Sequence, residues 1–98
     1  MVNVLIRHKV SDFDKWKKVF DEHLGMRKAG GELNCRIFYN EMDNAEVILF
    51  LDWETLEMAK RFFQSDTFRS KIQAAGVSGP PEIIYLDEIR ALRRTAAD

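Results

Sequence analysis

The chain has 98 residues, of which 46% are hydrophobic and 32% are charged, and its formal net charge at pH 7 is −1. This length predicts one domain over residues 1–98, and the interleaving of acidic and basic side chains excludes the strongly basic surface typical of nucleic-acid-binding proteins. No apolar run approaches the ~20 residues that cross a bilayer, the alternating N-terminus is unlike an export signal, and Cys35 is the only cysteine. We therefore expect a cytoplasmic protein with neither a nucleic-acid nor a membrane partner.

The first third of the chain predicts a strand followed by a helix. Residues 2–10 alternate apolar and polar side chains with period two, which indicates a half-buried strand. Ser11 and Asp12 supply oxygens that cap a helix, and the apolar residues of 13–27 have helical spacing. The sequence AGG at 29–31 ends this helix, because glycine accepts the left-handed cap conformation.

The remainder of the chain alternates periodic segments with turn and cap residues. In order, the predicted elements are a strand at 34–41, a turn at 42–45, a strand at 46–53, a helix at 56–64 capped by Thr55, a break at Ser65 or Asp66, a helical piece at 67–75, a rigid connection at 76–81, a strand from 82 to about 92, and a loose tail at 93–98. The order strand, helix, strand, strand, helix, strand predicts an α+β, ferredoxin-like βαββαβ fold with a four-stranded antiparallel sheet.

One strand of this plan is apolar on both sides. Residues 47–51 are apolar without a break, although an antiparallel sheet with one solvated face normally alternates. Residues 83–86 repeat the pattern in the last strand. No spare element covers the helix-free face, so we expect a homodimer whose sheets pack face to face, a dimeric α+β barrel. A monomer with an unusually apolar sheet is the alternative.

The two histidines, His8 and His23, both point toward apolar surroundings. His8 shares strand parity with Ile6, and His23 lies on the same helix face as Phe20 and Trp16. If the helix returns antiparallel to the strand, His23 lies ~15 Å along the helix. His8 lies only ~7 Å back from the strand end. This offset is too long for a direct hydrogen bond between the two rings.

The space between the first helix and the sheet is the candidate site. Its predicted catalytic residues are His8 and His23, since a neutral imidazole in an apolar cavity can donate or accept a proton near pH 7. Its predicted ligand-binding residues are Trp16, Phe20, Arg27 at the mouth, Phe62 or Phe63, and Tyr85. Structural interpretations remain open for the same side chains: aromatic core, a backbone carbonyl partner for His8, helix-dipole complementation by Arg27, and the dimer seam for Tyr85.

Other kinds of site find no support in the sequence. Two histidines and the distant Cys35 do not match a zinc spacing, so no metal is expected. A G-x-S-x-G elbow and a glycine-rich phosphate loop are both absent, and no cofactor is expected.

Three segments carry a resemblance to a known family. The sequences RHKVSDFDKWKKVFDEH, FFQSDTFRSKIQ and AGVSGPPE resemble the dimeric α+β barrel superfamily, and more narrowly small bacterial proteins near the antibiotic biosynthesis monooxygenases. The resemblance implies a homodimer with a hydrophobic cavity in each subunit. Relatives include cofactor-independent oxygenases of polycyclic phenols, whose substrates themselves activate oxygen, and haem-degrading monooxygenases.

The haem-degrading branch is a poor match at its own motif. That branch has a tryptophan where this chain has Phe62 and an axial histidine where it has Ile72, and isoleucine cannot bind iron. The resemblance therefore implies a cofactor-independent, monooxygenase- or cyclase-type enzyme acting on an aromatic or polyketide-like molecule. A non-catalytic ligand-binding or sensing homodimer that uses the same cavity is the alternative, and a structural protein with a filled core is a third.

Overall fold

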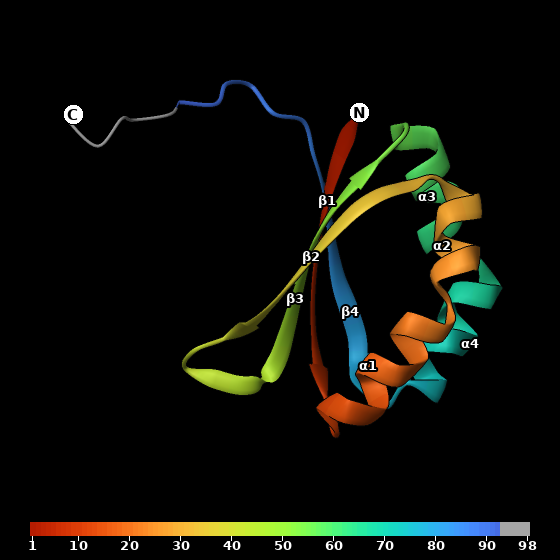
Figure 1. Cartoon of the computed structure of the whole chain (residues 1–98), viewed down its shortest axis with the longest axis vertical. Coiled ribbons are helices and arrows are strands. Elements are labelled where there is room, and N and C mark those ends of the chain that lie inside the picture. Colours follow the sequence, from red (N-terminus) through yellow and green to blue (C-terminus); the bar gives the residue numbers. More distant parts are fainter. Residues whose placement is uncertain (93–98) are drawn as a thin grey trace.

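The structure is a computed structural model that describes residues 1–92, so the tail predicted at 93–98 lies outside the described residues. The elements follow in the order β1 (Val2–Val10), α1 (Phe13–Glu22), α2 (Leu24–Gly30), β2 (Glu32–Asn40), β3 (Asp43–Trp53), α3 (Leu56–Phe63), α4 (Asp66–Ala74) and β4 (Val77–Leu86). The four strands form one antiparallel sheet in the order β2-β3-β1-β4, and the helices lie on one side of it (Figure 1). The predicted ferredoxin-like α+β fold is confirmed.

The helix predicted over 13–27 is interrupted at His23. This residue ends α1 and precedes α2, with φ −98° and ψ 15°. Its backbone N–H bonds to Phe20 O at 3.3 Å, three residues back, which is the tighter 3₁₀ pattern. Gly25 follows in the first turn of α2 and weakens the helix further.

The last strand begins earlier and ends earlier than the sequence pattern predicts. It starts at Val77, opposite Val10, rather than at 82, and the segment 76–81 is mostly strand rather than a connection. Pro80 and Pro81 fit because β4 is an edge strand, where a missing N–H leaves no ladder partner unpaired. The strand stops at Leu86 because the pairing with β1 ends there, at Asn3.

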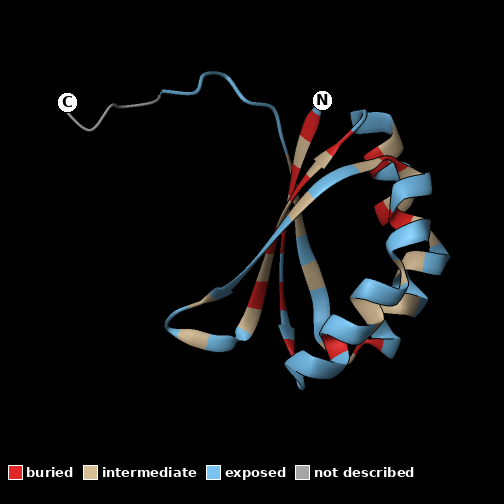
Figure 2. Cartoon of the chain, viewed as in Figure 1, coloured by how far each residue is buried: buried red, intermediate tan, exposed pale blue. Residues whose placement is uncertain are grey.

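The core lies between the sheet and the helices. Alternate residues of β1 and β3 face the helices, and Val4, Val47 and Trp53 have no exposed surface. Trp16 of α1 and Phe63 of α3 complete this layer from the helix side. Figure 2 shows the buried positions alternating along the central strands.

The opposite face of the sheet has an apolar centre that no element among residues 1–92 covers (Figure 1). Ile48 and Phe50 of β3 share this face with Leu5 of β1, as the pairing of Leu5 with Phe50 requires. Phe38 of β2 and Ile84 of β4 extend the patch across the sheet. The prediction that the third strand is apolar on both sides is confirmed.

Candidate functional site

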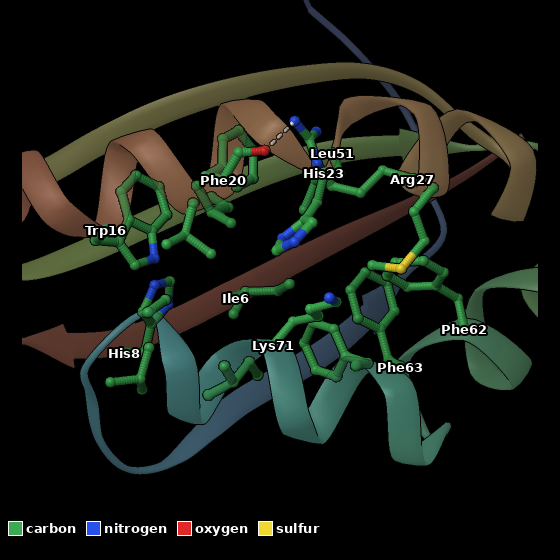
Figure 3. A pocket seen from close by; sticks show the side chains of 17 residues that line it. Ile6, His8, Trp16, Phe20, His23, Arg27, Leu51, Phe62, Phe63 and Lys71 are labelled. Atoms are coloured by element: carbon green, nitrogen blue, oxygen red, sulfur yellow. Dashed lines mark hydrogen bonds between the residues drawn. The ribbon is translucent and has the colours of Figure 1, made fainter.

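A cavity of about 80 Å³ lies between the helices and the sheet (Figure 3). Its lining comes from β1, β3, all four helices and the start of β4, and most of its side chains are apolar. The apolar lining residues are Ile6, Val19, Phe20, Met26, Leu49, Leu51, Phe62, Phe63, Phe68, Ile72, Ala75 and Val77. The site is therefore an apolar chamber into which a few polar groups project.

His8 lies at one end of the cavity, where β1 presents it on the core side. The residue is 8% exposed, and its ring centre lies 5.5 Å from that of Trp16. Its Nδ1 is buried without a hydrogen-bond partner, so the backbone carbonyl considered as a partner for this nitrogen is not found. Burial lowers the pKa of His8 to about 4, which keeps the ring neutral at pH 7. A neutral ring suits hydrogen bonding to a ligand better than storing a proton.

His23 lines the same cavity from the junction of α1 and α2. It is half-buried and projects inward beside Phe20 and Arg27 (Figure 3). Its backbone N–H and carbonyl cap the two helices, whereas its ring has no hydrogen-bond partner among residues 1–92. The structure thus brings both histidines to one cavity without a hydrogen bond between them, as the axial offset predicted.

The predicted aromatic residues form two walls. Trp16 and Phe20 stack on α1 with ring centres 5.0 Å apart and planes 15° apart. On the opposite side, Phe62 and Phe63 of α3 meet edge to face at 5.1 Å, and Phe63 contacts Phe68 of α4 at 5.0 Å in the same way. These rings belong to the core and also line the cavity. The interpretation of these residues as aromatic core is therefore compatible with their interpretation as walls of the cavity.

Arg27 lines the cavity, but its charge is not free at a mouth. Its Nη1 forms an ion pair with Glu32 and donates to both carboxylate oxygens, at 2.5 and 2.6 Å, and its Nη2 donates to Phe20 O at 3.1 Å. The same group lies 3.6 Å from the centre of the Phe20 ring. Glu32 was not singled out by the sequence, and it makes Arg27 a buried clamp between α2 and β2 rather than a ligand-facing cation.

Tyr85 lies on the helix side of the sheet, because it pairs with Val4. It is half-buried against the core and is not among the residues that line the cavity. Burial raises the pKa of its hydroxyl. The structure therefore places Tyr85 on neither the cavity wall nor the helix-free face.

Lys71 of α4 lines the cavity and was missed by the sequence reasoning. It follows Phe68 by three residues, so it shares the inward stripe of α4 with Phe68 and Ala75. The signal available in the sequence was a lysine at a position that belongs to the apolar stripe of the predicted helix.

The described residues offer no clustered metal ligands. Within 1–92, no group of three or more His, Cys, Asp or Glu side chains could hold an ion together. Cys35 is half-buried, and burial together with Glu32 raises the pKa of its thiol to about 12. None of the helices in this part of the chain has the length and apolar character needed to cross a membrane.

Comparison with known proteins extends this description. No protein-family model and no curated protein sequence matches the chain. Solved structures do match it. SnoaB, a cofactor-independent oxygenase from Streptomyces nogalater, is 14% identical with a TM-score of 0.75, over 95% of this chain and 97% of that one. A protein of Caulobacter crescentus CB15 assigned to the antibiotic biosynthesis monooxygenases is 21% identical with a TM-score of 0.70, over 91% and 90%. A Bordetella bronchiseptica protein with the same assignment is 15% identical with a TM-score of 0.73, over 91% and 97%. The chain has the fold of the antibiotic biosynthesis monooxygenase-like proteins.

Proposed function

We propose that this protein is a cofactor-independent, monooxygenase- or cyclase-type enzyme that acts on an aromatic or polyketide-like molecule bound in the cavity. The observation that carries the proposal is that His8 lines an apolar chamber while its buried Nδ1 has no hydrogen-bond partner. An unpaired buried polar atom costs about 1–3 kcal/mol. A ligand with a hydroxyl or carbonyl group would remove that penalty, which supports a polar aromatic occupant.

The two histidines would take different roles. His8 is buried and neutral at pH 7, so it would orient the substrate through a hydrogen bond. His23 is only half-buried and would exchange the proton removed from the substrate with water. Loss of that proton makes a phenol or enol electron-rich, which favours its direct reaction with oxygen. The stacked rings of Trp16 and Phe20 would hold the substrate plane.

The size of the cavity sets a limit on the substrate. About 80 Å³ is well below the ~300–1,000 Å³ of ordinary ligand pockets. A larger groove of about 550 Å³ runs between α4 and β4, and it shares Phe63, Phe68, Ile72 and Val77 with the cavity. A substrate with several rings would need Phe68 and Ile72 to move, so that the two spaces join.

Turnover tests the catalytic proposal. Hydroxylated aromatic compounds with one to three rings are incubated with the wild-type protein and with His23→Ala and His8→Ala, and oxygen consumption, product mass and ligand affinity are measured. We expect His23→Ala to lower turnover about 10²-fold or more, in the range of a general base, with little change in affinity. We expect His8→Ala to weaken binding. A ligand that binds yet stays unchanged in all three proteins would favour the non-catalytic alternative. The low pKa of His8 and the small volume of the cavity both support that alternative.

We infer further that the protein is a homodimer that covers the helix-free face. The apolar centre around Leu5, Ile48 and Phe50 is flanked by polar contacts, Arg7 Nη2 to Glu46 at 3.1 Å and Asn3 Nδ2 to Asp52 at 2.6 Å. An apolar core with a polar rim is the usual anatomy of a stable interface.

Sedimentation at micromolar concentration tests this inference. We expect a dimer for the wild type and a shift toward monomer for Phe50→Lys, because a charge would then lie at the apolar centre. Leu24→Lys is the matched control, since Leu24 is an exposed apolar residue on the helix side. A folded monomeric wild type would overturn the dimer and leave the cavity proposal untouched.

A further inference from the structure

The polar side chains that line the cavity share one property: they carry nitrogen and no oxygen. They are His8, Trp16, His23, Arg27 and Lys71. The indole, guanidinium and ammonium nitrogens donate hydrogen bonds and cannot accept them, so only the two imidazoles offer an acceptor. No carboxylate, hydroxyl or amide side chain lines this cavity. A ligand that presents a hydrogen-bond acceptor therefore finds more partners here than one that presents a donor.

Among these groups, Lys71 is the one whose charge has no partner. Arg27 is neutralised by Glu32, and the ring of His8 is neutral at pH 7. Arg69, on the same helix as Lys71, pairs with Asp66 at 3.7 Å, whereas Lys71 forms no ion pair with any of residues 1–92. The cavity wall thus carries one uncompensated positive charge.

The position of Lys71 directs that charge at a ligand. Lys71 is half-buried, and its side chain reaches from α4 into the ring of lining side chains, toward the side on which His23 lies (Figure 3). Apolar walls lower the local dielectric response, so an ammonium group there attracts an anion more strongly than it would on the surface. The rest of the chamber, with Trp16 and Phe62 on opposite sides, suits an apolar body.

We propose that the cavity binds a compact apolar molecule that carries one oxyanion, either a carboxylate or an ionised hydroxyl, with the oxyanion on Nζ of Lys71. His23 would donate a second hydrogen bond to it, and the apolar body would pack between the two aromatic walls. The volume of about 80 Å³ is roughly half that of the ~150 Å³ apolar cavity that takes benzene, so the ligand is at most a short branched chain or a single ring, and a ring requires the cavity to widen. This inference rests on the cavity of the proposed function and deepens it, but it does not require turnover.

Paired anionic and neutral probes test the proposal on the full chain. Binding of benzoate and of benzamide, which have nearly the same shape, is measured by titration calorimetry without oxygen, so that no chemistry contributes. A charge–charge contact in a partly shielded site predicts at least about a tenfold preference of the wild type for benzoate. Lys71→Met should reduce this preference to within about twofold while leaving benzamide affinity unchanged. Lys60→Met removes the same charge from an exposed position on α3 and should keep the preference.

Two further arms make the test decisive. Lys71→Arg should retain the anion preference, and thermal unfolding should show that Lys71→Met is folded. Isobutyrate and ionised 4-nitrophenol, each against a neutral analogue, distinguish a carboxylate ligand from an ionised hydroxyl. The proposal is overturned if the wild type binds neither benzoate nor 4-nitrophenolate, if it binds the neutral probes equally well, or if Lys71→Met keeps the preference. Anion binding that Lys71 controls, together with no oxygen consumption in the separate turnover assay, would uphold this inference and count against the enzyme proposal.

Discussion

The helix pairs α1–α2 and α3–α4 form opposite walls of one cavity, and they are held to the sheet in different ways. The end of α2 is fixed to the sheet at three points: Arg27 clamps Glu32 of β2, the Trp53 indole donates to Gly30 O at 2.8 Å, and Glu54 N–H donates to Gly31 O at 2.9 Å. Gly31 has a φ of 120°, and a side chain there would collide with Trp53, so this junction requires glycine.

The far wall is looser. Helix α4 buries none of its residues fully, and the turn that follows it is held to the β1–α1 loop by Ser11, whose N–H and hydroxyl both donate to Gly76 O. Regions with few buried apolar contacts open at the smallest free-energy cost. We therefore expect the cavity to widen, and a ligand to enter, at α4 rather than at the clamp.

The largest expected effect comes from breaking the clamp. Glu32→Gln leaves the buried Arg27 charge without its counter-ion, and we expect the free energy of unfolding to fall by about 4 kcal/mol. Guanidinium unfolding at fixed protein concentration measures this loss. Glu57→Gln is the control, because the Glu57–Arg61 pair is exposed and should leave stability unchanged. Equal stability of the two variants would mean that the α2 wall is not anchored by its ion pair.

Much of this architecture was predictable because it depends on local patterns. Period-two and helical spacing gave the element order, and the predicted caps at Asp12, Thr55 and Ser65 accept from Lys15, Met58 and Phe68 N–H as expected. The early start of β4 was not predictable from the prolines, since their tolerance depends on β4 lying at the sheet edge.

Several members of the site were predictable, but the pairing of their charges was not. The helical and strand faces brought His8, Trp16, Phe20 and His23 to one cavity as expected. The pairing of Arg27 with Glu32 crosses the end of α2 and the turn at Gly31, so no spacing rule indicates it. Tyr85 shares the correct face, yet β4 is an edge strand and its residue lies beyond the cavity.

The next effect concerns His8, the buried histidine of β1 at the α1 end of the cavity. The pKa of His8 is about 4 in the folded protein and 6.5 in its ordinary state, so the unfolded chain takes up the proton first as pH falls. The contribution of neutral His8 to the free energy of unfolding is therefore complete above pH 6.5. As pH falls from 6.5 to 4 this contribution is lost, and the free energy of unfolding decreases by about 3 kcal/mol. Denaturant unfolding from pH 7 to 4 should show a shallower loss for His8→Gln than for the wild type.

A matched variant separates His8 from the carboxylates that titrate in the same range. His23→Gln removes the other histidine of the same cavity, which is half-buried rather than buried, and is the matched control for His8→Gln. If His8→Gln and the wild type lost stability in parallel, solvent would reach the His8 ring, and the α1 end of the cavity would not be closed.

The smallest effect compares the sheet with the α4 wall through one chemical change. Ile6 is 3% exposed on β1 and Ile72 is half-buried on α4, and both line the cavity. Truncation of a buried isoleucine to alanine costs about 2–5 kcal/mol, and less where the site can collapse. We expect Ile6→Ala to lower the free energy of unfolding by about 2 kcal/mol more than Ile72→Ala. Because Ile72 also borders the groove beside β4, Ile72→Ala should speed benzoate association in stopped flow, whereas Ile6→Ala should leave that rate unchanged. Equal association rates in both variants would place the entrance elsewhere. Ile72 separates the cavity from the groove, so if the cavity widens at α4, shortening this side chain must change the association rate first.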